Sequence, residues 1–527
     1  MRQRRLGFAV AGLLAATLAL FVPRPGAGQS AAGESASDPL VIAFNGGATT
    51  LDPIERSENT TYSWQRHIFD TLTLQGRDGR PEPRIVTAWK SLGPERWQLT
   101  LRHGVRFQNG DAMTAADVAE SIMDAKTNPK SQVANYVAGV QSAAAAGSDT
   151  VDVTTKAPSP LLPVQLTQIP LMPEAYIKRV GRAAFDQHPI GTGPYEFVDW
   201  LAQDHLNLKA WSGFWGPKPE FSYVKLESVP NGATRVAALL SGQVQVAEKV
   251  DPQDFARVKS SGKAYVTMTG GVRVIYLAMD YWRKSGSAGM AAGSPNPFMD
   301  PRVRQAVYQA LDIEALKNKI FDGAATVATQ FMAPSIEAYD PGVKRLPYDP
   351  AAAKRLLAEA GYPKGFSVRL DAPNDRYLDD ALVAQALGAM LQQIGIDVSV
   401  NAGPKAVFFP SINKGNFSVY MAGWGTTDPV SAYFTLYHCR DKAAGYGTVN
   451  REHYCDPKVD AVMAKAAQAF ETSKRVELER QAYRLANRKD FAYIPLYYED
   501  VIAGVSDQIA WTSRPDELIF AWQMKRK

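Results

Sequence analysis

A strand–helix–strand unit in the C-terminal half constrains the fold of this chain most. Residues 366–370 and 396–400 have the composition of buried strands, and residues 377–394 between them show the apolar periodicity of a helix that ends at Gly395. Two strands joined by a crossover of this size pair in parallel, with the helix against one face of the sheet. A mixed α/β fold is therefore predicted.

Shorter signals extend this interpretation along the chain. Asp300 and Asp349 are each followed by proline, which is typical of the first residues of a helix. Residues 114–126 begin with a threonine–aspartate capping pattern and continue with an apolar stripe, so a helix is predicted there too. Residues 272–279 and 417–421 are predicted to be strands, so helices and strands alternate over much of the sequence.

Length and composition bound the architecture. The 527 residues suffice for about two to four lobes. Hydrophobic residues make up 46% and charged residues 21%, which is the balance of a folded globular protein. A single segment could act in a membrane, and it lies at the extreme N-terminus, so a polytopic membrane protein is excluded.

The N-terminal residues have the order of a secretory signal peptide. Three arginines (Arg2, Arg4 and Arg5) precede an apolar run over residues 6–22, and proline and small residues follow. An N-terminal membrane anchor is the alternative reading of the same run. We predict a signal peptide over residues 1–28, a mature chain that begins near Gln29, and a periplasmic location.

The charge pattern argues against nucleic-acid binding. The formal net charge is +5, but four arginines and no acidic residue fall in the first 28 residues, so the remainder carries only +1. The last three residues, 525–527, are all basic. Binding to phosphates requires a concentrated basic face, which a nearly neutral body does not provide. No nucleic-acid partner is expected.

The two cysteines lie close together, each beside a histidine. Cys439 follows His438, and Cys455 lies two residues after His453. Two Cys and two His could bind zinc, but zinc ligands within each pair usually stand further apart. A disulfide in an exported protein would close a loop of about sixteen residues and stabilise by roughly 3 kcal/mol. We predict a Cys439–Cys455 disulfide and no metal site, with zinc and free thiols as the alternatives.

Common catalytic motifs are absent from the sequence. It contains no GxSxG, no HExxH and no GxxxxGK[ST] pattern. No catalytic residues, enzymatic activity or cofactor are therefore predicted. The residue that stands out instead is Trp424, because the flanking glycines Gly423 and Gly425 suggest a loop in which an aromatic face could meet a ligand.

Six segments in order along the chain resemble one family. They are LDPIERSENTTYSWQRHIFDTLTL, PRIVTAWKSLGPERWQLTLRHGVRFQNGDAMTAADVAESI, HPIGTGPYEFVDW, NPFMDPRVRQAVYQALDIEAL, YDPAAAKRLLAEAGYPKGF and GNFSVYMAGWGTTDP. Together they are similar to the bacterial extracellular solute-binding proteins of family 5, the dipeptide-, oligopeptide- and nickel-binding components of ABC importers. The resemblance covers nearly the whole mature chain.

The resemblance implies a fold and a division of the chain. The expected architecture is the two-lobed α/β fold of periplasmic binding proteins, with an extra domain inserted in the first lobe and a hinge of two crossing strands near residues 272–280 and 485–495. The implied parts are a discontinuous lobe I (38–75, 186–275 and 490–527), an inserted subdomain (76–185) and lobe II (276–489). A ligand would be enclosed when the lobes close about the hinge.

The resemblance also implies ligand-binding residues. Trp424 corresponds to a stacking residue. In peptide-binding members an aspartate three residues later pairs with the peptide amine. Here Thr427 occupies that position and Asp428 follows it, so both are candidate ligand residues. Tyr62 lies in a region that lines the cleft in relatives, and Arg273 could meet a ligand carboxylate.

The implied function is capture of a peptide or peptide-like solute by lobe closure and its delivery to an ABC importer. Expected partners are the ligand and the permease subunits in the inner membrane, and the protein is expected to be a monomer. A nickel chelate, an opine or an oligosaccharide is the alternative ligand within the same fold. A secreted hydrolase and a sensory or chaperone-like binding protein are the other function classes considered.

Overall fold

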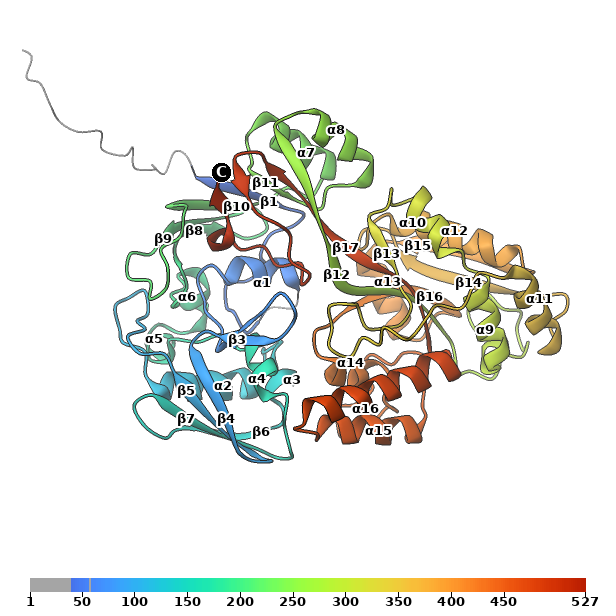
Figure 1. Cartoon of the computed structure of the whole chain (residues 1–527), viewed down its shortest axis with the longest axis horizontal. Helices are drawn as coiled ribbons and strands as arrows, with labels where there is room; N and C mark the ends of the chain where they lie inside the picture. Colours follow the sequence, from blue (N-terminus) through green and yellow to red (C-terminus); the bar gives the residue numbers. More distant parts are fainter. Residues whose placement is uncertain (1–38, 56–57) are drawn as a thin grey trace, which may run out of the picture.

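The computed structural model describes residues 39–55 and 58–527. The predicted signal peptide and its cleavage site lie outside these residues. Figure 1 shows two lobes side by side, joined by the long strands β12 (Ala264–Met279) and β17 (Tyr493–Ser506). The predicted two-lobed α/β fold is confirmed.

One sheet of eleven strands in the described part of the chain runs through both lobes. Its order is β15 (Ile396–Gly403), β14 (Phe366–Pro373), β16 (Val419–Gly425), β12, β17, β11 (Val246–Glu248), β1 (Leu40–Phe44), β10 (Tyr223–Ser228), β9 (His205–Ala210) and β8 (Tyr195–Leu201), with β13 (Ala325–Val327) paired to β17. The central strands β12 and β17 are antiparallel and belong to both lobes.

The joining strand β12 faces two cores at once. Ile275 and Leu277 belong to one hydrophobic cluster, whereas Val274 and Tyr276 belong to another, because successive side chains point to opposite faces. The sequence placed a strand over residues 272–279, and the observed strand begins eight residues earlier. A shift of register between Gly270 and Val274 separates the two halves of the β12–β17 pair.

The second lobe contains the predicted parallel unit. β14 and β15 pair in parallel, from Phe366 opposite Ile396 to Pro373 opposite Gly403. The crossover helix α12 (Asp380–Gln392) packs on both strands. This helix begins three residues later than expected, because the Asp380 carboxylate accepts the N–H groups of Arg376 and Tyr377 and forms a turn there. The other helices of this lobe are η3 (Pro297–Met299), α9 (Pro301–Gln309), α10 (Ile313–Lys319), α11 (Pro350–Glu359), α13 (Lys405–Asn413), α14 (Pro429–Leu436), α15 (Pro457–Ala467), α16 (Thr472–Arg484) and the π-helix η4 (Leu485–Lys489).

The first lobe is built around β1 and its neighbours. β1 pairs in parallel with β10 and β11, and apolar side chains from these strands form a separate core. Its helices are α1 (Asn59–Gln65), α7 (Gly232–Ser241), η2 (Pro252–Asp254), α8 (Phe255–Ser260) and η5 (Ala521–Gln523), and its short strand pairs are β2 (Thr73–Gln75) with β3 (Pro81–Pro83) and β18 (Ile509–Ala510) with β19 (Lys525–Arg526).

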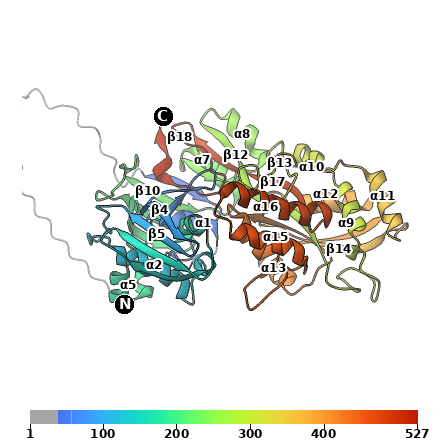
Figure 2. The same ribbon diagram turned by 60° about the horizontal axis from the view of Figure 1, so that its bottom comes forward.

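Residues 76–185, here called the inserted segment, carry a four-stranded sheet with its own core. Its main elements are β4 (Val86–Gly93), β5 (Arg96–Leu101), α2 (Ala115–Thr127), α3 (Ala134–Val137), β6 (Val140–Ala145), β7 (Thr150–Thr155), α4 (Leu162–Gln165), η1 (Leu166–Gln168), α5 (Glu174–Val180) and the start of α6 (Arg182–Gln187). Thr114 and Asp117 form the predicted capping box at the start of α2. In Figure 2, β4, β5 and α2 lie on one side of the molecule and α15 and α16 on the other.

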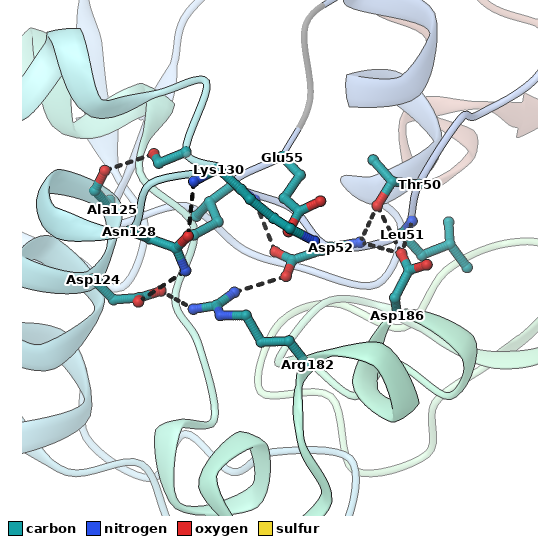
Figure 3. A network of polar contacts seen from close by, with 12 residues as sticks. Thr50, Leu51, Asp52, Glu55, Asp124, Ala125, Asn128, Lys130, Arg182 and Asp186 are labelled. Atoms are coloured by element: carbon teal, nitrogen blue, oxygen red, sulfur yellow. Dashed lines mark hydrogen bonds and ion pairs between the residues drawn. The ribbon is translucent and has the colours of Figure 1, made fainter.

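A polar network attaches the inserted segment to the first lobe (Figure 3). Arg182 forms ion pairs with Asp52, at 2.7 Å, and with Asp124 on α2. Asp186 on α6 accepts the backbone N–H groups of Leu51 and Asp52. The network therefore binds the loop after β1 to α2 of the inserted segment and to α6 at its border.

None of the helices in the described ranges is both long enough and apolar enough to cross a lipid bilayer.

Candidate functional site

A cleft of about 690 Å³ lies between the two lobes, beside β12. The first lobe supplies α1 and the C-terminal loop around Glu517, and the inserted segment supplies α3, α4 and η1. The second lobe supplies the end of β16, the loop that follows it and the start of α14. All five predicted ligand residues line this cleft, namely Tyr62, Arg273, Trp424, Thr427 and Asp428.

Trp424 lies in a strand, not in the loop that its flanking glycines suggested. Strand β16 continues to Gly425, and Trp424 is opposite Val274 of β12. Gly423 is required for another reason: a Cβ atom there would lie 2.8 Å from the ring of Tyr377 and 2.6 Å from Ile275. The Trp424 side chain is half-buried and lines the cleft, which positions an aromatic surface next to a ligand.

Asp428 caps a helix with one carboxylate oxygen, and its other oxygen makes no hydrogen bond within the described residues. Its Oδ1 accepts the N–H of Ser431 at 3.0 Å and caps α14. Its Oδ2 has no hydrogen-bond partner among the described residues, although the side chain is only 7% exposed. Burial raises the pKa of this carboxyl, and the capping N–H groups only partly offset that effect. A cationic group placed at Oδ2 would stabilise the charged form.

Tyr62 contacts the inserted segment, and Thr427 contacts Gln75 just before that segment begins. The Thr427 hydroxyl lies 3.5 Å from Oε1 of Gln75 and can donate to it across the cleft. Tyr62 on α1 is buried, and its hydroxyl donates to the carbonyl of Thr167 at 2.9 Å. Tyr62 therefore lines the cleft with its hydroxyl proton already donated within the protein.

Arg273 is engaged with carboxylates of the protein itself. Its Nε and Nη2 donate to the two oxygens of Glu517 at 2.8 Å each, and Nε also lies 3.3 Å from Glu499. Burial disfavours the charge of Arg273, but the two glutamates outweigh burial and raise its pKa. In return, Arg273 lowers the pKa of the half-buried Glu517 to about 2. The cluster joins β12, β17 and the C-terminal loop.

Arg376 is a cleft residue that the sequence interpretation missed. It lies in the loop after β14, lines the cleft, and is half-buried, with its guanidinium carbon 5.4 Å from the centre of the Tyr377 ring. Its guanidinium forms no ion pair or hydrogen bond with residues 39–55 or 58–527. Ligands of α/β folds bind at the carboxyl ends of parallel strands, and that rule could have singled out this arginine.

The two cysteines close a loop that forms one wall of the cleft. Cys439 and Cys455 are joined in a disulfide, and Gly445, Thr448 and Arg451 of the enclosed loop line the cavity. The nearby histidines are engaged elsewhere: His438 with the carbonyl of Cys439 and His453 with Arg440. Within the described ranges, no three His, Cys, Asp or Glu side chains gather in a way that could hold a metal ion.

The two lobes, the strands that join them and the cleft between them define the fold of a periplasmic binding protein. A model of the bacterial extracellular solute-binding proteins, family 5 Middle, matches residues 80–444. The chain belongs to the bacterial extracellular solute-binding proteins of family 5. Members of this family are periplasmic binding proteins that work with ABC importer permeases, and they are not enzymes.

Individual relatives span almost the whole chain. The glutathione-binding protein GsiB of Salmonella choleraesuis (strain SC-B67) is 26% identical over 489 residues, which are 90% of this chain and 91% of that protein. The periplasmic binding protein DppA of Helicobacter pylori, solved with the peptide STSA, has a TM-score of 0.78 at 22% identity and covers 92% of this chain and 98% of its own. NikZ of Campylobacter jejuni, solved with Ni(L-His), has a TM-score of 0.78 at 22% identity, over 93% of this chain and 99% of its own.

Proposed function

We propose that this protein captures a small peptide or peptide-like solute in the cleft between its lobes and delivers it to the permease of an ABC importer. One observation carries the ligand class. The 690 Å³ cleft is lined by Asp428, whose buried Oδ2 has no hydrogen-bond partner among the described residues, and by Arg376, whose guanidinium forms no ion pair with them. A solute with an amine and a carboxylate complements both groups.

In this binding mode each end of the solute meets its own residue. The amine approaches Oδ2 of Asp428, and the carboxylate approaches Arg376, which can bind it with two parallel hydrogen bonds. The ring of Trp424 lies on the same cavity and stacks on the solute between its ends. Arg273 stays paired with Glu517 and supports the cleft from the hinge side.

The ligands named for the relatives fit this chemistry. Glutathione and the peptide STSA each contain an amine and a carboxylate that are charged at neutral pH. Their sizes differ widely, so the shared pair of charged ends is what transfers to this chain. The wall of the cleft formed by the disulfide loop and the inserted segment would then select for size and shape.

The proposed mechanism divides the chain as its family resemblance implies. Lobe I comprises residues 38–75, 186–275 and 490–527, the inserted subdomain 76–185, and lobe II 276–489. Closure about β12 and β17 encloses the solute, and the closed form is presented to the permease. We expect a monomer that is exported by the signal peptide at residues 1–28 and that has no nucleic-acid partner.

Calorimetric titration with Ala-Ala and with glutathione tests this proposal. Wild type should bind at least one of them, and Asp428→Asn and Arg376→Met should each weaken that binding by about 10- to 100-fold, because each removes one charged partner. Lys442→Met, on the surface of the disulfide loop, is the control for loss of a cation and should bind as wild type does.

Blocked peptides separate the two ends. Amidation of the ligand carboxylate should weaken binding to wild type but not further weaken binding to Arg376→Met, and acetylation of the amine should act in the same way toward Asp428→Asn. Equal losses for both ligands in both variants would show that the two residues do not contact opposite ends. Absence of binding by any free amine–carboxylate ligand would refute the peptide assignment.

A further inference from the structure

A second cavity, here called the side chamber, adjoins the cleft behind Asp428. It has a volume of about 570 Å³ and lies between the inserted segment and helix α16. Val164, Thr427 and Asp428 line both cavities, so a solute anchored at Asp428 is within reach of the side chamber. The proposed function uses the cleft alone and leaves the side chamber without a role.

Aromatic side chains form much of the wall of the side chamber. Trp89 on β4 and Trp97 on β5 come from the inserted segment, and Phe470, between α15 and α16, comes from the other lobe. The rings of Trp97 and Phe470 stack at 5.9 Å between centroids, and Phe470 remains 37% exposed. The faces of such rings attract cations.

The remaining wall has more carboxylates than guanidinium groups. Arg475 lies 3.6 Å from Glu479 and 3.5 Å from Glu337, and Arg80 lies 3.5 Å from Glu337. The lining acids are Asp78, Glu337, Asp428 and Glu479, against the two bases Arg80 and Arg475. Glu479 is only 2% exposed, and the unpartnered Oδ2 of the buried Asp428 lies on the same wall. Two buried carboxyls thus line the chamber, and the arginine nearest to them, Arg475, is shared with Glu337.

We propose that the side chamber is a specificity subsite for a cationic group, so that the protein prefers peptides whose N-terminal residue is lysine or arginine. The proposal rests on the proposed function, because the peptide amine at Asp428 directs the first side chain into the chamber. There a lysyl or arginyl head group meets the faces of Trp89 and Phe470 and the carboxyl of Glu479.

Competition between a proton and the ligand cation follows from this arrangement. Burial raises the pKa of Glu479 to about 8, and the neighbouring Asp428 and Glu337 act in the same direction, whereas Arg475 and Arg480 oppose them. Tyr483, the other titratable neighbour, remains a neutral phenol because burial raises its pKa. A ligand cation must therefore release the proton of Glu479, and the preference for a cationic side chain should grow as the pH rises toward 8.

The test is a pair of dipeptides, Lys-Ala and Ala-Ala, titrated by calorimetry. Wild type should bind Lys-Ala about 10-fold or more tightly than Ala-Ala, and Glu479→Gln and Trp89→Ala should each reduce this ratio to about threefold or less. The ratio should rise between pH 6 and pH 8 in wild type and stay flat in Glu479→Gln. Because the N-terminal amine is common to both ligands, its own titration cancels in the ratio.

Glu452→Gln is the matched control. Glu452 is also fully buried in the same lobe with a pKa of about 8, but it lines neither cavity, so its removal should leave the ratio as in wild type. A wild-type ratio near one, or a ratio that Glu479→Gln does not change, would overturn the side-chamber proposal. If neither dipeptide binds at all, the proposed function fails, and the chamber is then tested with agmatine, a cation without a carboxylate. A rise in melting temperature with agmatine that Glu479→Gln abolishes supports the chamber alone, and no rise overturns it.

Discussion

The inserted segment contacts both of its neighbours, but the two contacts differ in kind. Toward the first lobe, Arg182 pairs with the buried Asp52 at 2.7 Å, and Asp186, on the same helix α6 just beyond the inserted segment, accepts two backbone N–H groups (Figure 3). Toward the second lobe, the contacts include the exposed pair of Arg80 with Glu337 at 3.5 Å, the ring stack of Trp97 with Phe470, and Leu161 at the edge of the apolar core of that lobe. The contact with the first lobe buries the Asp52 carboxylate, whereas the contact with the second lobe borders the 570 Å³ side chamber.

The difference indicates which parts move together. Breaking buried ion pairs costs several kcal/mol, so the inserted segment is expected to move with the first lobe as one body. Exposed ion pairs and one stacked ring pair contribute about 1 kcal/mol each, so this contact can open and close with ligand. Closure of the cleft then consists of the second lobe moving against this body about β12 and β17.

The largest expected effect is a pH dependence of the free energy of unfolding, caused by Glu479 beside the side chamber. The folded-state pKa of Glu479 is about 8, above its ordinary value, so the folded protein holds a proton that the unfolded chain has lost. The free energy of unfolding should therefore fall by about 1.4 kcal/mol per pH unit between about pH 5 and pH 8 from this group alone. Urea unfolding across this range measures it, and Glu479→Gln should remove that part of the slope. An unchanged slope would show that Glu479 is not protonated in the folded protein.

Removal of Arg182 from the contact between the inserted segment and the first lobe should destabilise the protein. Arg182→Ala leaves Asp52, whose side chain is 2% exposed, without its cation, and the free energy of unfolding should fall by about 3 kcal/mol. Arg80→Ala is the matched control at the other contact and should cost about 0.5 kcal/mol or less, because its side chain is 69% exposed. Similar losses for both variants in urea unfolding would contradict the comparison.

Trp424→Ala should affect binding more than folding. The ring is half-buried at the cleft, and loss of a stacked aromatic should weaken ligand binding by about 1–3 kcal/mol, or roughly 5- to 150-fold. Titration of a confirmed ligand measures the effect. Trp282→Ala, which removes a 53% exposed tryptophan outside the cleft, should bind as wild type does. If the Trp424 variant binds normally, the ring does not contact the solute.

The smallest effect is expected for Phe470→Ala. Its ring stacks on Trp97 across the contact that opens, and such a pair contributes about 0.5–1.5 kcal/mol. The substitution should leave the midpoint of urea unfolding nearly unchanged while small-angle scattering shows a larger radius of gyration with ligand. A loss of stability as large as that of Arg182→Ala would place Phe470 in a permanent interface.

Local signals predicted much of the fold. The parallel unit of β14, α12 and β15 is confirmed, as is the capping box of Thr114 with Asp117, because each depends on residues close in the sequence. The glycines around Trp424 were misleading: they suggested a loop, but a strand continues through them because Tyr377 packs where a side chain at Gly423 would lie. Three-dimensional packing decided that position.

The candidate site was only partly accessible from the sequence. The family pattern pointed to Trp424 and Asp428, and both line the cleft, whereas the only sequence signal for Arg376 is its position just after a predicted parallel strand. The partner of Arg273, Glu517, lies 244 residues away, so its engagement could not be predicted from neighbouring residues.

The sequence by itself determined the family, through the order of its motifs, and the starts of the helices capped by Thr114, Asp300 and Asp349, because a cap depends on residues a few positions apart. The tertiary structure decided which charges are neutralised and which face the cavities. Glu479 and Asp428 are 51 positions apart, and only the packing of α16 against α14 places them on one chamber. Charge interactions depend on distance and burial in space, and neither quantity is set by position along the chain.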